Sequence, residues 1–371
     1  MKFSTTKTDL QASLQKLSKI VPARSTIPIL GNVLITSDNG SIIMRATDLE
    51  QTMILNIPAS IKEEGNAVVP VNTLLNVANE LPDGRVTLSV DSKLNVSLKS
   101  ESGDYDLKGM ASEEFPAPPE TDEQKPVTIS SELLKIIFQL TGFAISRDEL
   151  KPALTGVLFQ FDKNMLTTVA TDGHRLVRYK IKEFDSGGFS GDIIIPRKFL
   201  SLSQNLLGQT ETVEIQMGKN HITASFGDDT VHSRIIDERY PDFESVIPTN
   251  NDKMLTIDLQ ELTSAVRRVS IFSNRTTQQI AIKMNDGTVE IATEDPEKAT
   301  RALEKLSAEY TGEPMTIGYN ASYLKELLSF MPSKRVVLKL NTPISATVFY
   351  PEETEEERDI TMLLMPIRLN D

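Results

Sequence analysis

The sequence has no cysteine, no tryptophan and only three histidines among its 371 residues. Without thiols, disulfides, thiolate metal sites and a cysteine nucleophile are all excluded. The histidines, His174, His221 and His232, form no HExxH or HxH pair. The sequence therefore argues against a histidine-rich metal centre, and we expect neither a metal nor another cofactor.

Long apolar runs are also missing. The longest, such as Ile193–Ile195, fall far short of the roughly 18 residues that a membrane span requires. The first residues, Met1–Thr6, include a lysine but no apolar segment follows them, so they do not resemble a secretory signal. We therefore expect a cytoplasmic protein that does not contact a membrane.

Motifs of catalysis are absent as well: the chain has no GxxxxGK[ST], no GxGxxG and no GxSxG. Gly187–Gly191 is rich in glycine but lacks the lysine and the helix start of a phosphate loop, so we predict a hairpin loop there. Asp172, His174 and a distant serine would suit a hydrolase, yet nothing specifies a nucleophile. The sequence predicts a protein that is not an enzyme.

What is present is ordinary globular composition, with 39% hydrophobic and 25% charged residues and a net charge of −13. The length corresponds to two or three domains. The negative net charge by itself argues against simple electrostatic capture of nucleic acid, because phosphate binding usually shows as a basic patch.

A threefold internal repeat organises the chain. Ala46–Asp48 recurs as Ala170–Asp172 and, more weakly, as Ala292–Glu294, at intervals close to one third of the length. Glu113–Pro116 similarly resembles Glu238–Pro241. The sequence therefore predicts three copies of one domain. The predicted domains are residues 1–124, 125–249 and 250–371.

Each copy contains two similar halves. Amphipathic helix patterns begin near residues 8, 72, 131, 198, 259 and 322, and segments with a period of two lie between them. The predicted strands include Val86–Val90, Val213–Met217, Val336–Leu340 and Ile344–Val348. Two polar segments rich in helix and strand breakers, Pro116–Pro126 and Pro248–Lys253, are candidate linkers. Six helix-plus-antiparallel-strand halves predict an α+β fold.

Positive charge is concentrated on the predicted helices. The six helices with their flanking loops sum to +7, which leaves −20 for the rest of the chain. Helices on one face of a sheet would then form a surface that attracts phosphates. Lysines and arginines that merely solvate helix surfaces explain the pattern equally well. The helices lack interleaved aromatic residues, so any nucleic-acid contact would be with the backbone.

Four segments together resemble one family, the bacterial DNA polymerase III beta subunits or sliding clamps. They are Pro28–Asn32, Ala170–Leu176, Tyr240–Phe243 and Met365–Leu369, and the resemblance covers essentially the whole chain. It implies a DNA clamp fold, in which two chains of three domains close head to tail into a homodimeric ring with helices lining the hole and sheets outside. Duplex DNA would be encircled without sequence specificity, and the replicative polymerase would be tethered for processivity. An ATP-driven clamp loader would open the ring.

The resemblance also implies a cleft between the second and third domains that binds short peptides of polymerases, the clamp loader and repair proteins. Its apolar wall would accept leucine or phenylalanine, and a few polar groups would hold the peptide backbone. The implied cleft residues are Leu154, Thr171, Gly173, His174, Arg175, Leu176, Pro241, Val246, Asn320, Tyr323, Ile344, Met365, Pro366, Ile367, Arg368 and Leu369.

Three features of the cleft have alternative interpretations. Members of the family can carry arginine just before Val246, where this chain has Ser245, so the preferred peptide motif is open. Asp172–His174 could form only a turn with a structural histidine, although Gly-His-Arg occurs in the middle copy alone. Met365–Leu369 could be a final strand that fills its own core.

Further residues are assigned by the same resemblance. The basic residues expected near DNA are Arg24, Arg147, Lys151, Arg197, Lys198, Arg267, Arg268 and Arg275, each of which could instead be an ordinary solvated side chain. At the ring interface, Tyr105 and Leu107 would meet Ile271 and Phe272 of a second chain; the latter pair could instead belong to the domain core. A repeat-built adaptor or solute-binding protein that does not encircle DNA is the alternative function.

Overall fold

The structure is a computed structural model that describes residues 1–38, 40–119 and 126–369. The chain forms two compact units. The first consists of Met1–Lys135 with Lys198–Ile235, and the second of Ile136–Arg197 with Ile236–Asp371. Each unit therefore contains part of the predicted middle domain, whose boundary at 124/125 lies outside the described residues.

The six predicted helices are confirmed, each beginning at or one residue before the predicted position. They are α1 (Lys7–Ser18), α2 (Val71–Glu80), α3 (Ser131–Gly142), α4 (Arg197–Ser203), α5 (Leu259–Ser270) and α6 (Ala321–Ser329).

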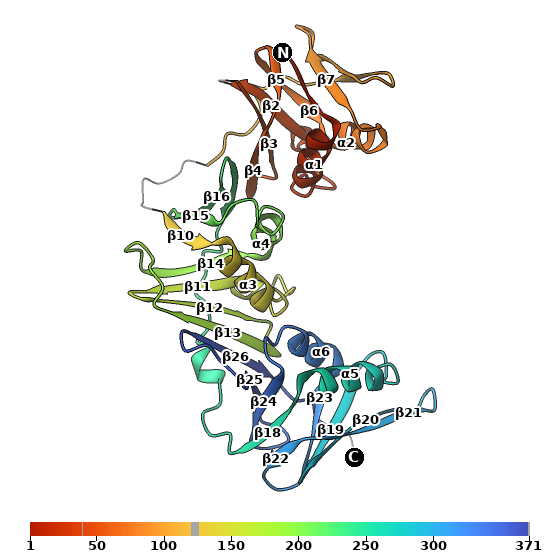
Figure 1. Ribbon diagram of the computed structural model, residues 1–371, viewed down its shortest axis with the longest axis vertical. Coiled ribbons are helices and arrows are strands. Elements are labelled where there is room, and N and C mark those ends of the chain that lie inside the picture. The colour runs from red at the N-terminus through yellow and green to blue at the C-terminus, as the bar shows by residue number, and fades with distance from the viewer. Residues whose placement is uncertain (39, 120–125, 370–371) are drawn as a thin grey trace. The chain divides into compact units, whose positions relative to one another are not determined.

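The helices begin and pack as their sequences require. The Thr6 side chain accepts a hydrogen bond from Asp9 N at the start of α1, and Asp258 accepts one from Glu261 N at the start of α5, which satisfies otherwise unpaired amides. Leu10, Leu14 and Leu17 form the buried stripe of α1. Within their respective units, α1 lies beside α2 and α5 beside α6 (Figure 1).

Among the described residues, the first unit contains two antiparallel sheets. Five strands in the order β5-β1-β7-β8-β9 form one sheet, and eight strands in the order β10-β15-β16-β17-β4-β3-β2-β6 form the other. Their bounds are β1 (Lys2–Thr6), β2 (Asn32–Asp38), β3 (Ser41–Thr47), β4 (Gln51–Ile57), β5 (Ser60–Glu63), β6 (Gly65–Pro70), β7 (Arg85–Val90), β8 (Asn95–Lys99), β9 (Asp104–Lys108), β10 (Val127–Ser130), β15 (Thr212–Met217), β16 (His221–Phe226) and β17 (Asp229–Arg234).

The second unit, as far as it is described, has a nine-stranded sheet in the order β14-β11-β12-β13-β26-β25-β24-β18-β22 and a four-stranded sheet in the order β21-β20-β19-β23. The bounds are β11 (Gly156–Asp162), β12 (Met165–Thr171), β13 (Arg175–Lys182), β14 (Gly191–Pro196), β18 (Lys253–Asp258), β19 (Gln279–Asn285), β20 (Thr288–Asp295), β21 (Thr300–Ser307), β22 (Glu309–Thr311), β23 (Met315–Asn320), β24 (Arg335–Leu340), β25 (Thr347–Pro351) and β26 (Arg358–Leu364).

Strands from successive copies of the repeat pair directly. β4 of the first copy pairs with β17 of the second, and β13 of the second pairs with β26 of the third, both antiparallel. We call these two ladders the first and the second junction. Because each large sheet is shared by two copies, the compact units do not coincide with the three copies.

Sheet register corrects one detail of the repeat. Equivalent positions in the three copies are held by Leu34, Leu158 and Ala281. Each of them pairs with the residue two places before the end of a strand, which is β6, β14 and β23, respectively. Their partners on the next strand are Arg45, Val169 and Ala292. Ala292 is therefore equivalent to Val169 and not to Ala170. The predicted alignment of Ala292–Glu294 with the other two copies was therefore wrong by one residue. Thr293, and not Ala292, is equivalent to the alanine at the start of each of the other two segments.

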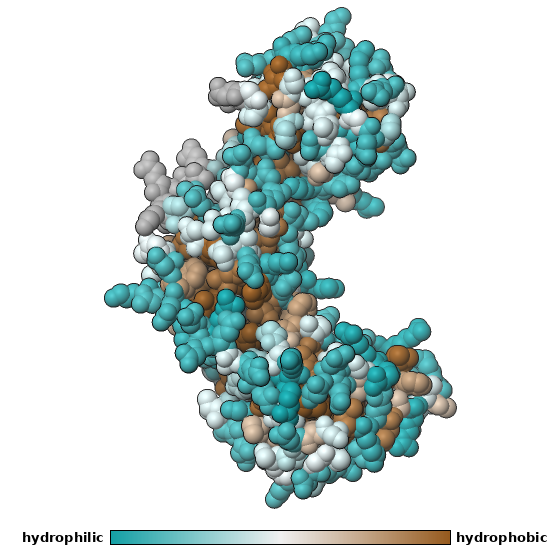
Figure 2. All heavy atoms as spheres, viewed as in Figure 1, coloured by the Kyte–Doolittle hydropathy of each residue, from teal (hydrophilic) through white to brown (hydrophobic). Residues whose placement is uncertain are grey.

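The predicted strand Ile344–Val348 is wrong in its first half, because β25 begins at Thr347. Residues 342–345 form a turn, closed by a backbone hydrogen bond from Ser345 N to Thr342 O of 3.2 Å, and Ile344 is 65% exposed. A loop is present at the predicted Gly187–Gly191, but the hairpin was wrong, because the loop connects β13 and β14, which are not neighbours in the sheet, and β14 already begins at Gly191. Figure 2 shows hydrophilic side chains over most of the visible face, with hydrophobic residues most visible around α3.

Candidate functional site

The second unit carries an open groove of about 610 Å³ beside the second junction. It is bounded by the ends of β12 and β13, the segment 240–250 and the residues around β25 and β26. It is lined by Leu154, Thr171, Gly173, Arg175, Leu176, Tyr240, Pro241, Asp242, Phe243, Ser245, Val246, Pro248, Asn250, Ser345, Ala346, Leu363 and Met365. We call it the second groove.

The floor of the second groove is an apolar cross-strand pair. Leu176 on β13 lies opposite Leu363 on β26, and both are buried. They pack in one cluster with Leu158, Val169 and Ile194. Leucine pairs at a strand junction present a continuous apolar surface to whatever lies above them.

The wall of the groove comes from the segment after β17. Tyr240 and Phe243 pack on the leucine cluster with their rings edge to face, 6.5 Å apart between centroids. The Tyr240 hydroxyl donates to Val169 O at 3.4 Å, and burial raises the pKa of Tyr240 well above its ordinary value. Tyr240 therefore stays a neutral part of the wall.

A tight turn between β12 and β13 forms one end of the groove. Asp172 Oδ1 accepts hydrogen bonds from the amides of His174 and Arg175, at 2.9 and 3.0 Å. The Thr171 hydroxyl donates to Arg175 O at 2.6 Å. Gly173 has φ +89°, a left-handed conformation that glycine adopts without strain. The turn that the sequence allowed as an alternative is thus present, and it lines the groove.

Arg175 ties this turn to two helices. It is only 7% exposed, and its guanidinium pairs with Asp172 at 3.0 Å and with Glu326 of α6. It also donates to Phe143 O at 2.6 Å, just after α3, and lies 4.6 Å from the ring centroid of Tyr323. Because the side chain is buried and saturated with partners, we describe it as a positioning residue for the groove.

The structure brings together half of the predicted cleft residues. Those that line the groove are Leu154, Thr171, Gly173, Arg175, Leu176, Pro241, Val246 and Met365. Three other predicted residues lie next to the lining: His174 stacks on Tyr323 with ring centroids 5.8 Å apart, and Asn320 caps the start of α6. Ile344 precedes the lining residues Ser345 and Ala346 but does not line the groove itself.

The last predicted segment leaves the groove after its first residue. Met365, which is 42% exposed, lines the groove, and its amide donates to His174 O at 2.8 Å. Ile367 instead forms a β-bridge with Gly318 on β23, and Leu369 also lies close to that glycine. Pro366, Ile367, Arg368 and Leu369 are therefore outside the groove lining, as the alternative of a strand that packs on its own domain implied.

Several lining residues were not predicted from sequence. These are Tyr240, Asp242, Phe243, Ser245, Pro248, Asn250, Ser345, Ala346 and Leu363. The Tyr-Pro-Asp-Phe segment was a visible signal, although only its proline was assigned to the cleft. Leu363 had no local signal, because its role depends on pairing with Leu176 far away in the sequence.

A smaller cavity of about 150 Å³ occupies the corresponding place beside the first junction, and we call it the first groove. Here Thr52 lies opposite His232. His232 accepts or donates a hydrogen bond of 2.9 Å with the Thr223 hydroxyl. Burial, together with the nearby His221 and Arg45, lowers the pKa of His232 to about 4, so the ring is neutral at pH 7.

The predicted DNA-facing residues fall into two groups. Five are exposed and form no ion pair within the described chain: Arg24, Arg147, Lys151, Arg267 and Arg275. The others are engaged within the chain: Lys198 with Asp48, Arg197 with Ile145 O at 2.5 Å, and Arg268 with Glu304 in a bidentate pair of 2.6 and 2.7 Å. Burial, followed by repulsion from Arg147 and Arg175, lowers the pKa of Arg197.

The predicted interface residues lie at two sheet edges. Tyr105 and Leu107 are half-buried on β9, the last strand of the five-stranded sheet. Ile271 and Phe272 follow α5 and are 77% and 42% exposed, so they do not belong to the domain core. The Thr300 hydroxyl on β21, the last strand of the four-stranded sheet, donates to Phe272 O at 3.3 Å.

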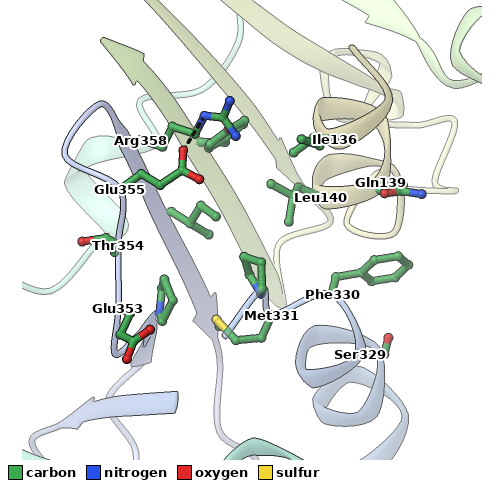
Figure 3. A pocket seen from close by; sticks show the side chains of 14 residues that line it. Ile136, Gln139, Leu140, Ser329, Phe330, Met331, Glu353, Thr354, Glu355 and Arg358 are labelled. Atoms are coloured by element: carbon green, nitrogen blue, oxygen red, sulfur yellow. Dashed lines mark ion pairs between the residues drawn. The ribbon is translucent and has the colours of Figure 1, made fainter. Parts of the chain in front are cut away.

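A further hollow of about 370 Å³ lies between α3, the end of α6 and the turn before β26 (Figure 3). Figure 3 shows Glu355 and Arg358 at one side, joined by an ion pair of 3.0 Å. Among the residues that the structure describes, no group of three or more histidines and carboxylates could hold a metal ion. No helix in the described ranges is long and apolar enough to span a membrane.

Family models match the three copies in order. The models described as the N-terminal, central and C-terminal domains of the DNA polymerase III beta subunit match residues 1–119, 128–242 and 244–368. Full-length relatives are similar throughout. The beta sliding clamps of Pseudomonas putida and Escherichia coli K12 are 29% and 28% identical, each with 100% of both chains covered.

Solved structures agree with these matches. The Bartonella birtlesii sliding clamp bound to griselimycin is 30% identical with a TM-score of 0.94, and the Pseudomonas aeruginosa clamp bound to griselimycin is 28% identical with a TM-score of 0.92. Both comparisons cover 100% of each chain.

Proposed function

The chain belongs to the DNA polymerase III beta subunit family and is a non-catalytic DNA sliding clamp, and on that premise we propose that two copies close head to tail into a ring around duplex DNA. Such a ring raises polymerase processivity by topology, since a tethered enzyme that lets go of its template remains at high effective concentration.

The sheet edges carry the ring proposal. Two junctions inside the chain each join a strand of one copy to a strand of the next. β9 of the first copy and β21 of the third are edge strands that hold the places of the junction strands, and neither is paired across a junction within the described chain. A contact between β9 of one chain and β21 of another would be heterologous, and two such contacts close a dimer. Tyr105, Leu107, Ile271 and Phe272 would then be shielded from water.

We assign DNA contact to the exposed basic residues first. Arg24, Arg147, Lys151, Arg267 and Arg275 are free to neutralise phosphates. Lys198 and Arg268 would contribute less because carboxylates already compensate their charges, and Arg197 because its half-buried side chain donates to Ile145 O. Contacts with phosphates do not distinguish one base sequence from another, and they allow the clamp to slide along the DNA.

We further propose that the second groove binds short peptides of the replicative polymerase, the clamp loader and repair proteins. Its apolar floor suits leucine and phenylalanine anchors, and its size suits a few side chains rather than a folded domain. The chain has no phosphate-binding loop with which to power its own opening, so a separate ATP-driven loader is part of the proposal. We place the protein in the cytoplasm, with the bacterial chromosome.

Threading on blocked DNA tests encirclement. The protein is mixed at low salt with linear DNA that carries biotin at both ends, streptavidin is then added, and the salt is raised. We expect retention through salt that abolishes ordinary phosphate binding, and rapid release when a restriction enzyme cuts the DNA. The same DNA without streptavidin is the control, from which the protein should slide off.

Two outcomes contradict the proposal. Equal loss from blocked and open DNA would show adhesion rather than encirclement. Light scattering at micromolar concentration that gives only the 41.2 kDa chain, instead of about twice that mass, would exclude the ring itself.

A further inference from the structure

The repeat fixes a register for the contact between two copies. On one side of each internal junction, Val231 and Met362 hold equivalent positions. A path that starts at the residue four places before α3, and moves from each residue to its partner on the next strand, ends at Val231. The same path from the residue four places before α5 ends at Met362. In the first copy, the same path starts on β1 at the residue four places before α1, passes through β7 and β8, and ends at Tyr105 on β9.

The other side of each junction is aligned in the same way. The equivalent residues Arg45, Val169 and Ala292 each have a partner on the following strand. In the same order, these partners are Ile54, Arg178 and Leu303. Met53 and Val177, one residue earlier, pair with Val231 and Met362 at the two junctions. The registers of both internal junctions are therefore identical, and the corresponding residue on β21 is Ala302.

We propose that β9 of one chain pairs antiparallel with β21 of a second copy with Tyr105 opposite Ala302, so that Asp106 lies opposite Arg301 and forms an ion pair that closes the ring. This inference rests on the proposed dimeric ring and names its register and its charge pairing. Large Tyr105 beside small Ala302 replaces the two medium-sized side chains found at each internal junction.

The charges at the two edges fit this pairing. On the face that carries Asp106, β9 also presents Asp104, whereas β21 presents Arg301 and Lys305. Within the described chain neither Asp106 nor Arg301 has an ion-pair partner, while Asp104 and Lys305 pair with Lys99 and Glu290 at 3.2 and 2.7 Å.

Lys108, the one cation of β9, contacts its own part of the chain: its ammonium donates to Lys93 O at 2.6 Å and to Asn95 Oδ1 at 3.1 Å. A symmetric dimer through two β9 strands would set aspartates against aspartates, and one through two β21 strands would set cations against cations. Like charges directly opposite destabilise a ladder, so the charges favour the head-to-tail pairing.

The pair also explains why this contact need not form another groove. Asp106 and Arg301 hold the positions of Leu363 and Leu176, the apolar floor of the second groove, and of His232 and Thr52 at the first junction. At the contact between two chains, an ion pair would therefore occupy the position where the second groove exposes an apolar surface.

Charge exchange tests the pairing. Asp106→Arg and Arg301→Asp should each weaken the dimer at low salt, raising its dissociation constant at least about tenfold, since both contacts of the ring become repulsive. An equal mixture of the two variants should form mixed dimers almost exclusively, because a mixed ring has one native and one exchanged pair. Native mass spectrometry counts the species. Lys283→Glu, an exposed charge reversal in the middle of the same sheet as β21, is the control and should dimerise normally.

Cysteine pairs test the register without relying on charge, since the chain has no cysteine of its own. The doubly substituted chain with Asp106→Cys and Arg301→Cys should crosslink into a covalent dimer on oxidation. The variant with Asp104→Cys and Arg301→Cys, displaced by two residues, should not, because diagonal positions are too far apart for a disulfide.

The outcomes separate the two proposals. A wild-type protein that is monomeric would overturn the ring. A dimeric wild type whose single variants dimerise normally and mix at random, or whose displaced cysteines crosslink better than the in-register pair, would overturn the register and leave the ring standing.

Discussion

The two grooves of this clamp occupy the same place in successive copies of one repeat, yet they differ in size and in the chemistry of the floor. The second groove has a volume of about 610 Å³ and a floor of two leucines, and the first has about 150 Å³ and a floor of Thr52 and His232. The backbone ladders beneath them have the same register.

This difference would restrict the proposed peptide binding to one copy of the repeat. Replacing an apolar pair by a threonine and a buried histidine removes the surface that an incoming leucine would cover, while the strand pairing that joins the copies stays intact. At the turn above the floor, the second groove has Gly173 with φ +89°, and the first has Leu49 with φ +79°, a strained conformation for leucine.

The largest effect should come from Arg175. Arg175→Met would leave Asp172 and Phe143 O without their partner and release the turn from α3 and α6. We expect unfolding to become easier by about 3–5 kcal/mol, as for a buried ion pair broken on one side. Urea denaturation measures this. The equivalent residue at the first junction is Gln51, whose buried side-chain oxygen has no hydrogen-bond partner within the described chain, so Gln51→Met should change the stability by less than about 1 kcal/mol; equal losses would refute the special role of Arg175.

Exchange of the floors should come next. Leu176→Thr combined with Leu363→His gives the second groove the floor of the first, and should lower the stability by about 2–4 kcal/mol. Binding of a short peptide with leucine and phenylalanine, in the micromolar range in the native protein, should weaken at least about tenfold. Calorimetry measures the affinity.

The reverse exchange is the matched control. Thr52→Leu combined with His232→Leu should leave peptide affinity and stoichiometry at the second groove unchanged. Normal binding to the first double variant, provided that it is folded, would show that the peptide site lies elsewhere.

A smaller effect distinguishes the two junctions by pH. The folded pKa of His232 is about 4, below its ordinary 6.5, so the unfolded chain binds more protons between these values and stability falls as the pH falls through this window. At pH 5 the loss should be about 2 kcal/mol relative to pH 7.5. Urea titrations of wild type and His232→Gln measure it: the variant should lose this part of the slope, and His221→Gln should retain it.

The sequence determined much of the architecture because the relevant signals are local. The periodic leucines of α1, such as Leu10 and Leu14, and the breaks between helices and strands fixed six helix positions and the threefold repeat. The absence of cysteines excluded disulfides and thiolate metal sites. The turn at Asp172–Arg175 was also visible, since one aspartate side chain caps its own neighbouring amides.

Only the tertiary structure decided which residues form the groove. Leu363 belongs to the floor because β26 pairs with β13, and Ile367 is outside the groove because it bridges to Gly318. The one-residue correction at Ala292 likewise came from sheet register. Pairing between strands that are far apart in the chain leaves no period in the sequence, and a shift of one residue sends every side chain to the other face of the sheet, so these assignments depend on the folded ladders alone.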